Sequence, residues 1–253
     1  MNGEFSATRW NGSRRLKAGM ERNSLDLETL KHQVRFGARS LRRKLNDIWG
    51  HVSARLPVAS GQDGFMLAHL RIPFKPAPPD ELYSFDYQGR LLEGKGQVPW
   101  EVPLYTSIYR ARPDVGSVVH VHPPLTIALG VSGQTIRAVH QLSACFSAGV
   151  PTFGGELINS EELGNRVAET LGDRRAILLV GHGAITVGAD VPEAVTTALL
   201  MEETARIQLL AGAAGEVQTL PPGILNPDIR SAARFIWRFL EWEEESGAAP
   251  RLR

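Results

Sequence analysis

Four short runs with strand character follow one another between residues 51 and 96, and they constrain the fold more than any other feature of the chain. They read HVSARLP, GFMLAHL, LYSFDYQG and LLEGKG, and glycine, proline and aspartate stand between them. Strand-forming runs punctuated by turn residues predict that this part of the chain forms a β-sheet. The segment GSVVHVHPP, at residues 116–124, predicts a further buried strand.

Helical spacing appears on both sides of this sheet region. Leucine and valine recur every three or four residues from Leu27 to Leu45, with Ser24 as the expected N-cap. The segment AILLVGHGAITVGA predicts two apolar strands joined by a turn. We therefore expect one α/β domain with a central, mostly antiparallel sheet and helices on its faces. The other expected helices cover residues 102–112, 125–133, 162–173, 192–215 and 229–245.

The first 24 residues are set apart from the fold. They are rich in arginine, serine and glycine and lack a hydrophobic period. This composition imitates a transit peptide, but a disordered tail is the favoured interpretation, with an internal start at Met20 as an open alternative. Residues 25–253 contain no linker long enough to divide them. They are expected to form a single domain with a C-terminal helical extension.

Charge and cysteine content exclude several classes of protein. The 28 basic and 27 acidic residues nearly cancel, so no strong field draws the chain to nucleic acid or to an anionic membrane. Cys145 is the single cysteine and has no partner for an internal disulfide. No apolar stretch approaches the roughly 20 residues that span a bilayer. We expect a cytoplasmic protein that binds a small molecule and neither nucleic acid nor a membrane.

Two histidines one residue apart close the apolar run VVHVHPP. Residues two apart in a strand project to the same face, so the imidazoles of His120 and His122 enter one volume. His182 lies at the end of another apolar run, between two glycines. Three histidines at strand ends suit a divalent ion such as zinc and leave a position for substrate. The alternative is three core histidines, each with its own hydrogen-bonding arrangement.

The order of these motifs resembles the class II aldolase/adducin family. The matching features are Gly-His-Val-Ser at residues 50–53, an acidic residue ahead of YRARPDVGSVVHVHPP, and GHGAITVG followed by a long helix. The similarity runs from about residue 27 to about residue 215. It implies a three-layer α/β/α fold and a ring-shaped homotetramer with active sites between subunits.

The resemblance also implies roles for individual residues. His120, His122 and His182 correspond to the metal ligands of the family's sugar-phosphate aldolases, and Glu101 corresponds to their acid/base. A carboxylate near a cation can complete the metal shell or move a proton, which supports this role independently. The alternative for Glu101 is a surface acid at a helix start.

The chain departs from the sugar-phosphate aldolases where those enzymes hold phosphate. Their asparagine, Thr-Pro-Ser/Thr-Gly turn and Ser-Ser pair are replaced here by His51, by Ala-His-Leu-Arg at residues 68–71 and by Pro99-Trp100. A phosphorylated sugar is therefore an unexpected substrate. The replacements favour a pocket for a flat carboxylated molecule. The alternatives are that Trp100 fills the core or a subunit interface, that His69 and Arg71 lie on a solvated edge, and that His51 caps the following turn. The candidate substrate-binding residues are His51, Ser53, His69, Arg71 and Trp100.

These features predict a divalent-metal-dependent lyase. We expect a decarboxylase of a hydroxylated, catechol-type aromatic carboxylic acid, of use in breaking down aromatic compounds, in which the metal stabilises an enolate or carbanion. Three alternatives remain: an aldolase for an unphosphorylated hydroxy-keto acid, a non-haem iron oxygenase, and a non-catalytic adducin-like module. Zinc is the expected ion, although imidazole ligands also suit manganese, cobalt and iron. His140 and Gln141 are weaker candidates, and Cys145 is expected to pack rather than react.

Overall fold

The computed structural model describes residues 25–70, 82–95, 98–221, 223–224 and 228–247. The expectations for residues 1–24 and for Arg71 lie outside these ranges. Within them, eight strands form one sheet in the order β4-β3-β2-β1-β5-β8-β7-β6. The strands are β1 (His51–Arg55), β2 (Gly64–His69), β3 (Leu82–Asp86), β4 (Leu91–Glu93), β5 (Ser117–Val121), β6 (Thr152–Phe153), β7 (Ala176–Leu179) and β8 (Gly183–Gly188).

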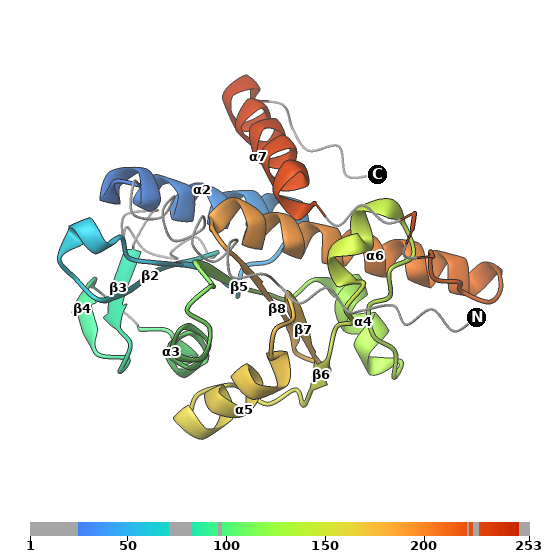
Figure 1. Ribbon diagram of the computed structural model, residues 1–253, viewed down its shortest axis with the longest axis horizontal. Helices are drawn as coiled ribbons and strands as arrows, with labels where there is room; N and C mark the ends of the chain where they lie inside the picture. Colours follow the sequence, from blue (N-terminus) through green and yellow to red (C-terminus); the bar gives the residue numbers. More distant parts are fainter. Residues whose placement is uncertain (1–24, 71–81, 96–97, 222, 225–227, 248–253) are drawn as a thin grey trace, which may run out of the picture.

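Helices cover both faces of the sheet, which confirms the predicted α/β/α layering. In Figure 1 the sheet is seen nearly edge-on, with α2 and α6 on one side and α3 and α5 on the other. No helix in the described ranges combines the length and apolar character that crossing a bilayer requires. The helices are α2 (Leu27–Leu45), α3 (Val102–Ala111), α4 (Pro124–Val131), α5 (Glu161–Leu171), α6 (Val191–Ala214) and α7 (Ile229–Ser246), with 3₁₀ turns η1 (Val58–Ser60) and η2 (Gln141–Phe146).

The sheet is antiparallel except at one edge. β1 pairs with β2 and β5, and β5 pairs with β8, all antiparallel. A tight turn joins β7 to β8, too short for the crossover that parallel neighbours need. β6 pairs in parallel with β7 and was not predicted, because a two-residue strand leaves no alternating pattern to detect.

Helix α2 begins and ends at residues with defined capping roles. The Asp26 side chain accepts a hydrogen bond from the backbone N–H of Thr29, so Asp26 is the N-cap. The prediction that Ser24 caps this helix was therefore wrong: the helix starts later, where an aspartate reaches the first turn. α2 ends at Leu45 because Asn46 turns into the left-handed region at φ 52°.

Strand alternation separates two apolar cores, one on each side of the sheet. Val119 and Val121 of β5 pack in the core under α2 and α6, whereas Val118 packs in the core under α3 and α5. His120 has the same parity as Val118 and is fully buried. A polar side chain is thus directed to the α3 side, at the end of a central strand.

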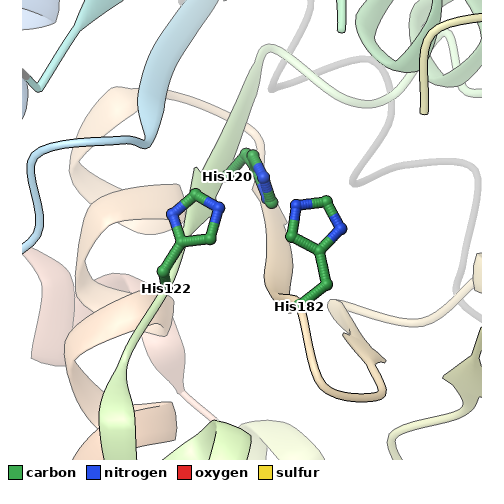
Figure 2. Close-up of side chains that lie close together, drawn as sticks. All are labelled: His120, His122 and His182. Carbon is green, nitrogen blue, oxygen red and sulfur yellow. The ribbon is translucent and has the colours of Figure 1, made fainter. Parts of the chain in front are cut away.

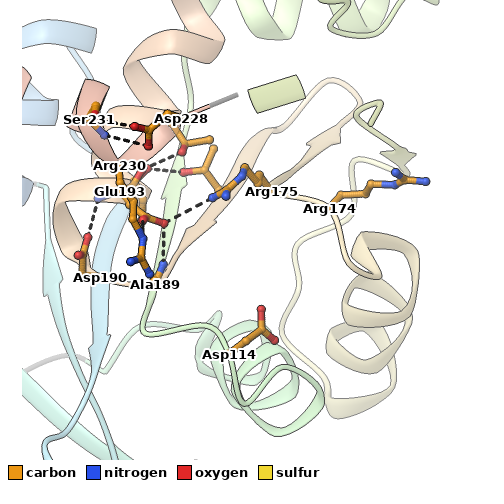
Figure 3. A network of polar contacts seen from close by, with 12 residues as sticks. Asp114, Arg174, Arg175, Ala189, Asp190, Glu193, Asp228, Arg230 and Ser231 are labelled. Atoms are coloured by element: carbon orange, nitrogen blue, oxygen red, sulfur yellow. Dashed lines mark hydrogen bonds and ion pairs between the residues drawn. The ribbon is translucent and has the colours of Figure 1, made fainter. Parts of the chain in front are cut away.

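Helix α7 packs against the rest of the fold through aromatic contacts and ion pairs. Trp237 is buried and meets the ring of Phe36 edge-on at 4.8 Å. Arg230 of α7 lies 3.1 Å from the buried carboxylate of Glu193, which Arg175 also approaches (Figure 3). Phe235, also on α7, remains 75% exposed.

Candidate metal centre

Three histidines from distant parts of the chain meet at one end of the sheet. His120 is on β5, His122 follows the end of that strand, and His182 lies in the turn between β7 and β8 (Figure 2). One candidate ligand atom from each lies within 4.8 Å of the others. The antiparallel pairing of β5 with β8 causes this meeting, since it places the end of β5 beside the start of β8.

Gly183 permits the close approach of these two strands. A β-carbon at residue 183 would lie 2.4 Å from the backbone oxygen of Val121 and 3.2 Å from Cδ2 of His122. Neither position can yield freely, because one is backbone and the other belongs to a candidate ligand. The glycine beside His182 is therefore a requirement of the packing.

The Nδ1 atom of each histidine already has an acceptor from the protein. His120 Nδ1 lies 3.0 Å from the backbone oxygen of Ala184, and His182 Nδ1 lies 3.2 Å from that of Glu156. His122 Nδ1 lies 3.3 Å from both carboxylate oxygens of Asp47. A carbonyl or carboxylate only accepts, so each Nδ1 carries the hydrogen and each Nε2 presents a lone pair.

The Nε2 lone pairs make this group suitable for a divalent cation. His120 Nε2 is buried and makes no hydrogen bond with any residue that the structure describes. A buried polar atom left in this state is destabilising unless a ligand satisfies it. Three imidazoles in one tautomer, held through Nδ1, form the donor set that zinc and similar ions prefer. The chemistry of the residues therefore fits a metal ion.

Asp47 orients His122 and was missed by the sequence analysis. Its carboxylate is buried and accepts hydrogen bonds from the backbone N–H groups of His122 at 2.6 Å and Trp49 at 2.9 Å, besides His122 Nδ1. Its hydrogen bonds with His122 hold the pKa of Asp47 below its usual value in spite of burial. An acid in a short loop 75 residues before its partner has no spacing rule that would reveal it.

Glu101 is placed against two of the three imidazoles. It is the N-cap residue of α3, but its side chain makes no capping hydrogen bond. Oε2 lies 3.3 Å from His120 Nε2, and Oε1 lies 3.7 Å from His182 Nε2. Glu101 is 6% exposed, so the alternative of a solvated surface acid at a helix start was wrong.

Charge interactions within this group oppose the effect of burial. Burial raises the pKa of Glu101, but the electrostatic effect of the nearby His120 and His182 imidazoles outweighs burial and lowers it to about 2. Burial and the neighbouring His120 lower the pKa of His182 to about 4. Glu101 is therefore an anion and His182 a neutral imidazole near pH 7, which are the states that bind a cation.

The candidate substrate-binding residues differ in where they lie. His51 of β1 is directly opposite both His69 of β2 and His120 of β5 in the sheet register. Its ring centroid lies 4.6 Å from that of His69 and 6.3 Å from that of His120, so the three imidazoles form a row across the sheet. Trp100 precedes Glu101 and is 68% exposed.

Ser53 and His140 lie among partners of their own, whereas Gln141 is exposed. Ser53 Oγ donates to the backbone oxygen of Val118 and is 2.8 Å from the hydroxyl of Tyr109, inside the core. His140 Nε2 is 2.9 Å from Oγ1 of Thr204. Burial raises the pKa of Cys145 to about 12, which agrees with packing rather than reactivity.

Comparison with known proteins identifies a family and several relatives. The family model described as "Class II Aldolase and Adducin N-terminal domain" matches residues 37–209. A 3,4-dihydroxyphthalate decarboxylase of Arthrobacter keyseri is 34% identical over 137 residues, which cover 51% of this chain and 55% of the relative. A 5-deoxy-D-ribulose 1-phosphate aldolase of Bacillus thuringiensis serovar kurstaki is 29% identical over 143 residues, 56% of this chain and 67% of the relative.

The solved structures agree with the fold. An aldolase II superfamily protein from Pseudomonas syringae superposes with a TM-score of 0.70 at 23% sequence identity, covering 87% of this chain and 92% of that one. The sequence match to the 3,4-dihydroxyphthalate decarboxylases spans only about half of their length, 53% to 55%. The fold is thus shared over most of the chain, whereas the sequence similarity is confined to part of it.

Proposed function

This chain belongs to the class II aldolase and adducin family, and on that premise we propose that it is a metal-dependent lyase that decarboxylates a catechol-type aromatic carboxylic acid. The observation that carries the proposal is the tautomer of the three histidines. His120, His122 and His182 are held through Nδ1, and their Nε2 atoms are left for a cation beside the buried carboxylate of Glu101.

The histidine triad would hold the metal, and Glu101 would move the proton. A divalent cation bound there supplies Lewis acidity, which stabilises negative charge on a substrate oxygen. The Glu101 carboxylate is ionised near pH 7, so it accepts the proton of a substrate hydroxyl. It then returns that proton to the ring carbon that carried the carboxylate. The bond from that carbon to carbon dioxide breaks, its electron pair stays on the ring carbon, and a C–H bond takes its place.

The row of imidazoles favours a carboxylated substrate. His51 and His69 extend from His120 across β1 and β2, in the direction away from His182. Imidazole groups donate hydrogen bonds to carboxylates, and Trp100 beside Glu101 offers an aromatic face. The similarity to 3,4-dihydroxyphthalate decarboxylases supports the same substrate class. Arg71, two residues after His69 in the sequence, is proposed as a further cation for the carboxylate.

An aldolase acting on an unphosphorylated hydroxy-keto acid is the second candidate. The similarity to a 5-deoxy-D-ribulose 1-phosphate aldolase supports it, and the same carboxylate would serve aldol cleavage. The two reactions differ in the fragment released, an aldehyde in one and carbon dioxide in the other. We further propose zinc as the ion and a homotetramer in the cytoplasm. Metal analysis by mass spectrometry and light scattering would test the ion and the assembly.

The decisive experiment measures products from a panel of substrates. The purified protein, stripped with a chelator and reloaded with zinc, manganese, cobalt or ferrous iron, is incubated with dihydroxylated benzoates and phthalates. We expect carbon dioxide release that depends on added metal and does not depend on oxygen. Release of an aldehyde from hydroxy-keto acids instead would favour the aldolase, and a requirement for oxygen would favour an oxygenase. No bound metal and no metal-dependent turnover would favour a non-catalytic module.

A further inference from the structure

Tyr105 carries a buried hydroxyl without a hydrogen bond. The residue is fully buried on α3, and its Oη makes no hydrogen bond with any residue in the described part of the chain. Buried hydroxyl groups are normally paired, and one that is not requires a reason, such as a ligand that is absent. This atom is therefore a candidate contact for a molecule that enters the site.

Tyr105 lies beside two residues of the proposed active site, Glu101 and His51. Tyr105 follows Glu101 by four residues, so both side chains lie on one face of α3, one turn apart. Its ring stands edge-on to that of His51, with centroids 6.0 Å apart, and Phe65 packs on it from the core side. The carboxylates of Glu101 and Asp47 lie near enough to raise its pKa electrostatically.

Tyr109, one turn further along α3, is a tyrosine of the same core whose hydroxyl does have a hydrogen-bond partner. It is equally buried, but its hydroxyl is 2.8 Å from Ser53 Oγ, and the guanidinium of Arg55 lies over its ring. The two tyrosines share a helix, a face and a degree of burial. Only the one beside Glu101 and His51 lacks a hydrogen bond to the described residues.

We propose that Tyr105 is a specificity-determining residue, whose hydroxyl donates a hydrogen bond to the carboxylate of the aromatic substrate. This inference rests on the proposed function and adds a residue to it. Burial and the adjacent carboxylates keep the hydroxyl protonated, so it acts as a donor and not as a base. His51, in ring contact with Tyr105, would bind the same carboxylate from β1.

The test compares Tyr105→Phe with Tyr109→Phe as a matched control in the zinc-loaded protein. The probes are 3,4-dihydroxybenzoate and catechol, which share the hydroxyl pair and differ in the carboxylate. Calorimetry measures the affinity of each variant for each probe. If a variant converts a probe to product, kcat/KM for that probe is compared instead. Thermal unfolding without a probe measures the stability of each variant.

We expect Tyr105→Phe to weaken binding of 3,4-dihydroxybenzoate roughly 10- to 100-fold, the effect of losing a hydrogen bond to a charged group. Catechol affinity should stay within about twofold. The unfolding midpoint should be unchanged or higher, because the Tyr105 hydroxyl makes no hydrogen bond with the described residues. Tyr109→Phe should lower the midpoint and leave both affinities alone.

Two results would overturn the inference. One is a Tyr105→Phe variant that binds both probes as the wild type does, or loses both equally. The other is a wild-type protein that does not bind the carboxylated probe at all. Failure of the proposed function has a different signature: binding of 3,4-dihydroxybenzoate that depends on Tyr105, without release of carbon dioxide from any acid of the substrate panel.

Discussion

Two buried glutamates, Glu101 and Glu193, show how a carboxylate that serves structure differs from one placed for a ligand. Glu193 lies on α6 with Arg230 at 3.1 Å, Arg175 at 3.4 Å and the backbone N–H of Ala189 at 3.1 Å (Figure 3). Its neighbours are permanent cations and a peptide donor. Such an arrangement is complete without any further molecule.

Glu101 has partners of another kind. Its oxygens face Nε2 of His120 and His182, and its backbone donor, Ile158 N–H, is 3.4 Å away. Imidazole is a cation only when protonated. Burial and the neighbouring His120 lower the pKa of His182 to about 4, whereas the charge of Glu101 raises the pKa of His120 in spite of burial. The group around Glu101 is therefore incomplete until a cation enters, whereas the group around Glu193 is finished. The following predictions test that distinction.

The largest effect is expected where a candidate ligand is removed. His120→Ala should abolish metal binding and activity. Only two imidazoles would remain as ligands, and two imidazoles bind a divalent ion weakly. Metal content after dialysis and product formation provide the measurement. His140→Ala is the control, since that imidazole is paired with Thr204 outside the triad. Normal metal content in His120→Ala would disprove the assignment.

The next effect separates proton transfer from metal binding. Glu101→Gln should retain metal and lower turnover about 100- to 10,000-fold, because the amide fills the same space but does not exchange a proton. Stopped-flow or coupled assays give turnover, and metal analysis of the same sample provides the comparison. A fully active Glu101→Gln variant would remove the acid/base role from this residue.

A smaller loss is expected from the residue behind the ligand. Asp47→Asn should weaken metal affinity roughly 10- to 100-fold, since the amide no longer orients His122 through a charged acceptor. Competition with a chromogenic chelator measures the affinity. Turnover at saturating metal should recover most of its wild-type value, and loss of turnover with intact affinity would contradict an orienting role.

The structural glutamate should show the opposite pattern. Glu193→Gln should lower the free energy of unfolding by about 1–3 kcal/mol, because Arg175 and Arg230 lose their charged acceptor. Metal content and kcat should stay within about twofold of the wild type. Urea denaturation beside the activity assay decides the matter. A selective loss of activity would show that the two glutamates are not separable as described.

The smallest effect concerns Glu244 of α7, which is only partly buried. Burial raises its pKa, but the hydrogen bond and charge of Arg39 and the charge of Arg43 lower it below the usual value. A lowered folded-state pKa contributes stability above the unfolded pKa that is lost as pH falls through the folded pKa. Glu244→Gln should therefore be less stable by under about 1 kcal/mol at pH 7. The difference in stability between Glu244→Gln and the wild type should vanish below the folded-state pKa of Glu244. Urea denaturation at pH 7 and at such an acidic pH measures it.

Much of the fold and of the histidine site could be predicted from the sequence, because both depend on local patterns of residues. The alternation of short apolar runs predicted the sheet, and the H-x-H pair with a third histidine between glycines predicted the meeting of three imidazoles. Such patterns survive in sequence because strand geometry repeats every two residues. Glu101 was placed by resemblance to a family and not by any pattern of its own.

The residues that escaped prediction act through contacts between distant segments. Asp47 reaches His122 across 75 residues, and Tyr105 looks like an ordinary core position of an amphipathic helix until its hydroxyl is seen to lack a hydrogen bond to the described residues. The cap at Asp26 was misassigned to Ser24 because both types cap helices equally well. Only tertiary placement distinguishes these cases.

The left-handed conformation of Asn46 has a consequence for the affinity of the proposed metal site. The left-handed conformation of Asn46 ends α2, and the next side chain, Asp47, accepts a hydrogen bond from the backbone N–H of His122. Asparagine accepts the conformation readily, and most other residues except glycine resist it. Substitutions at Asn46 should therefore change the affinity of the proposed metal site through Asp47, without altering a candidate ligand or Glu101.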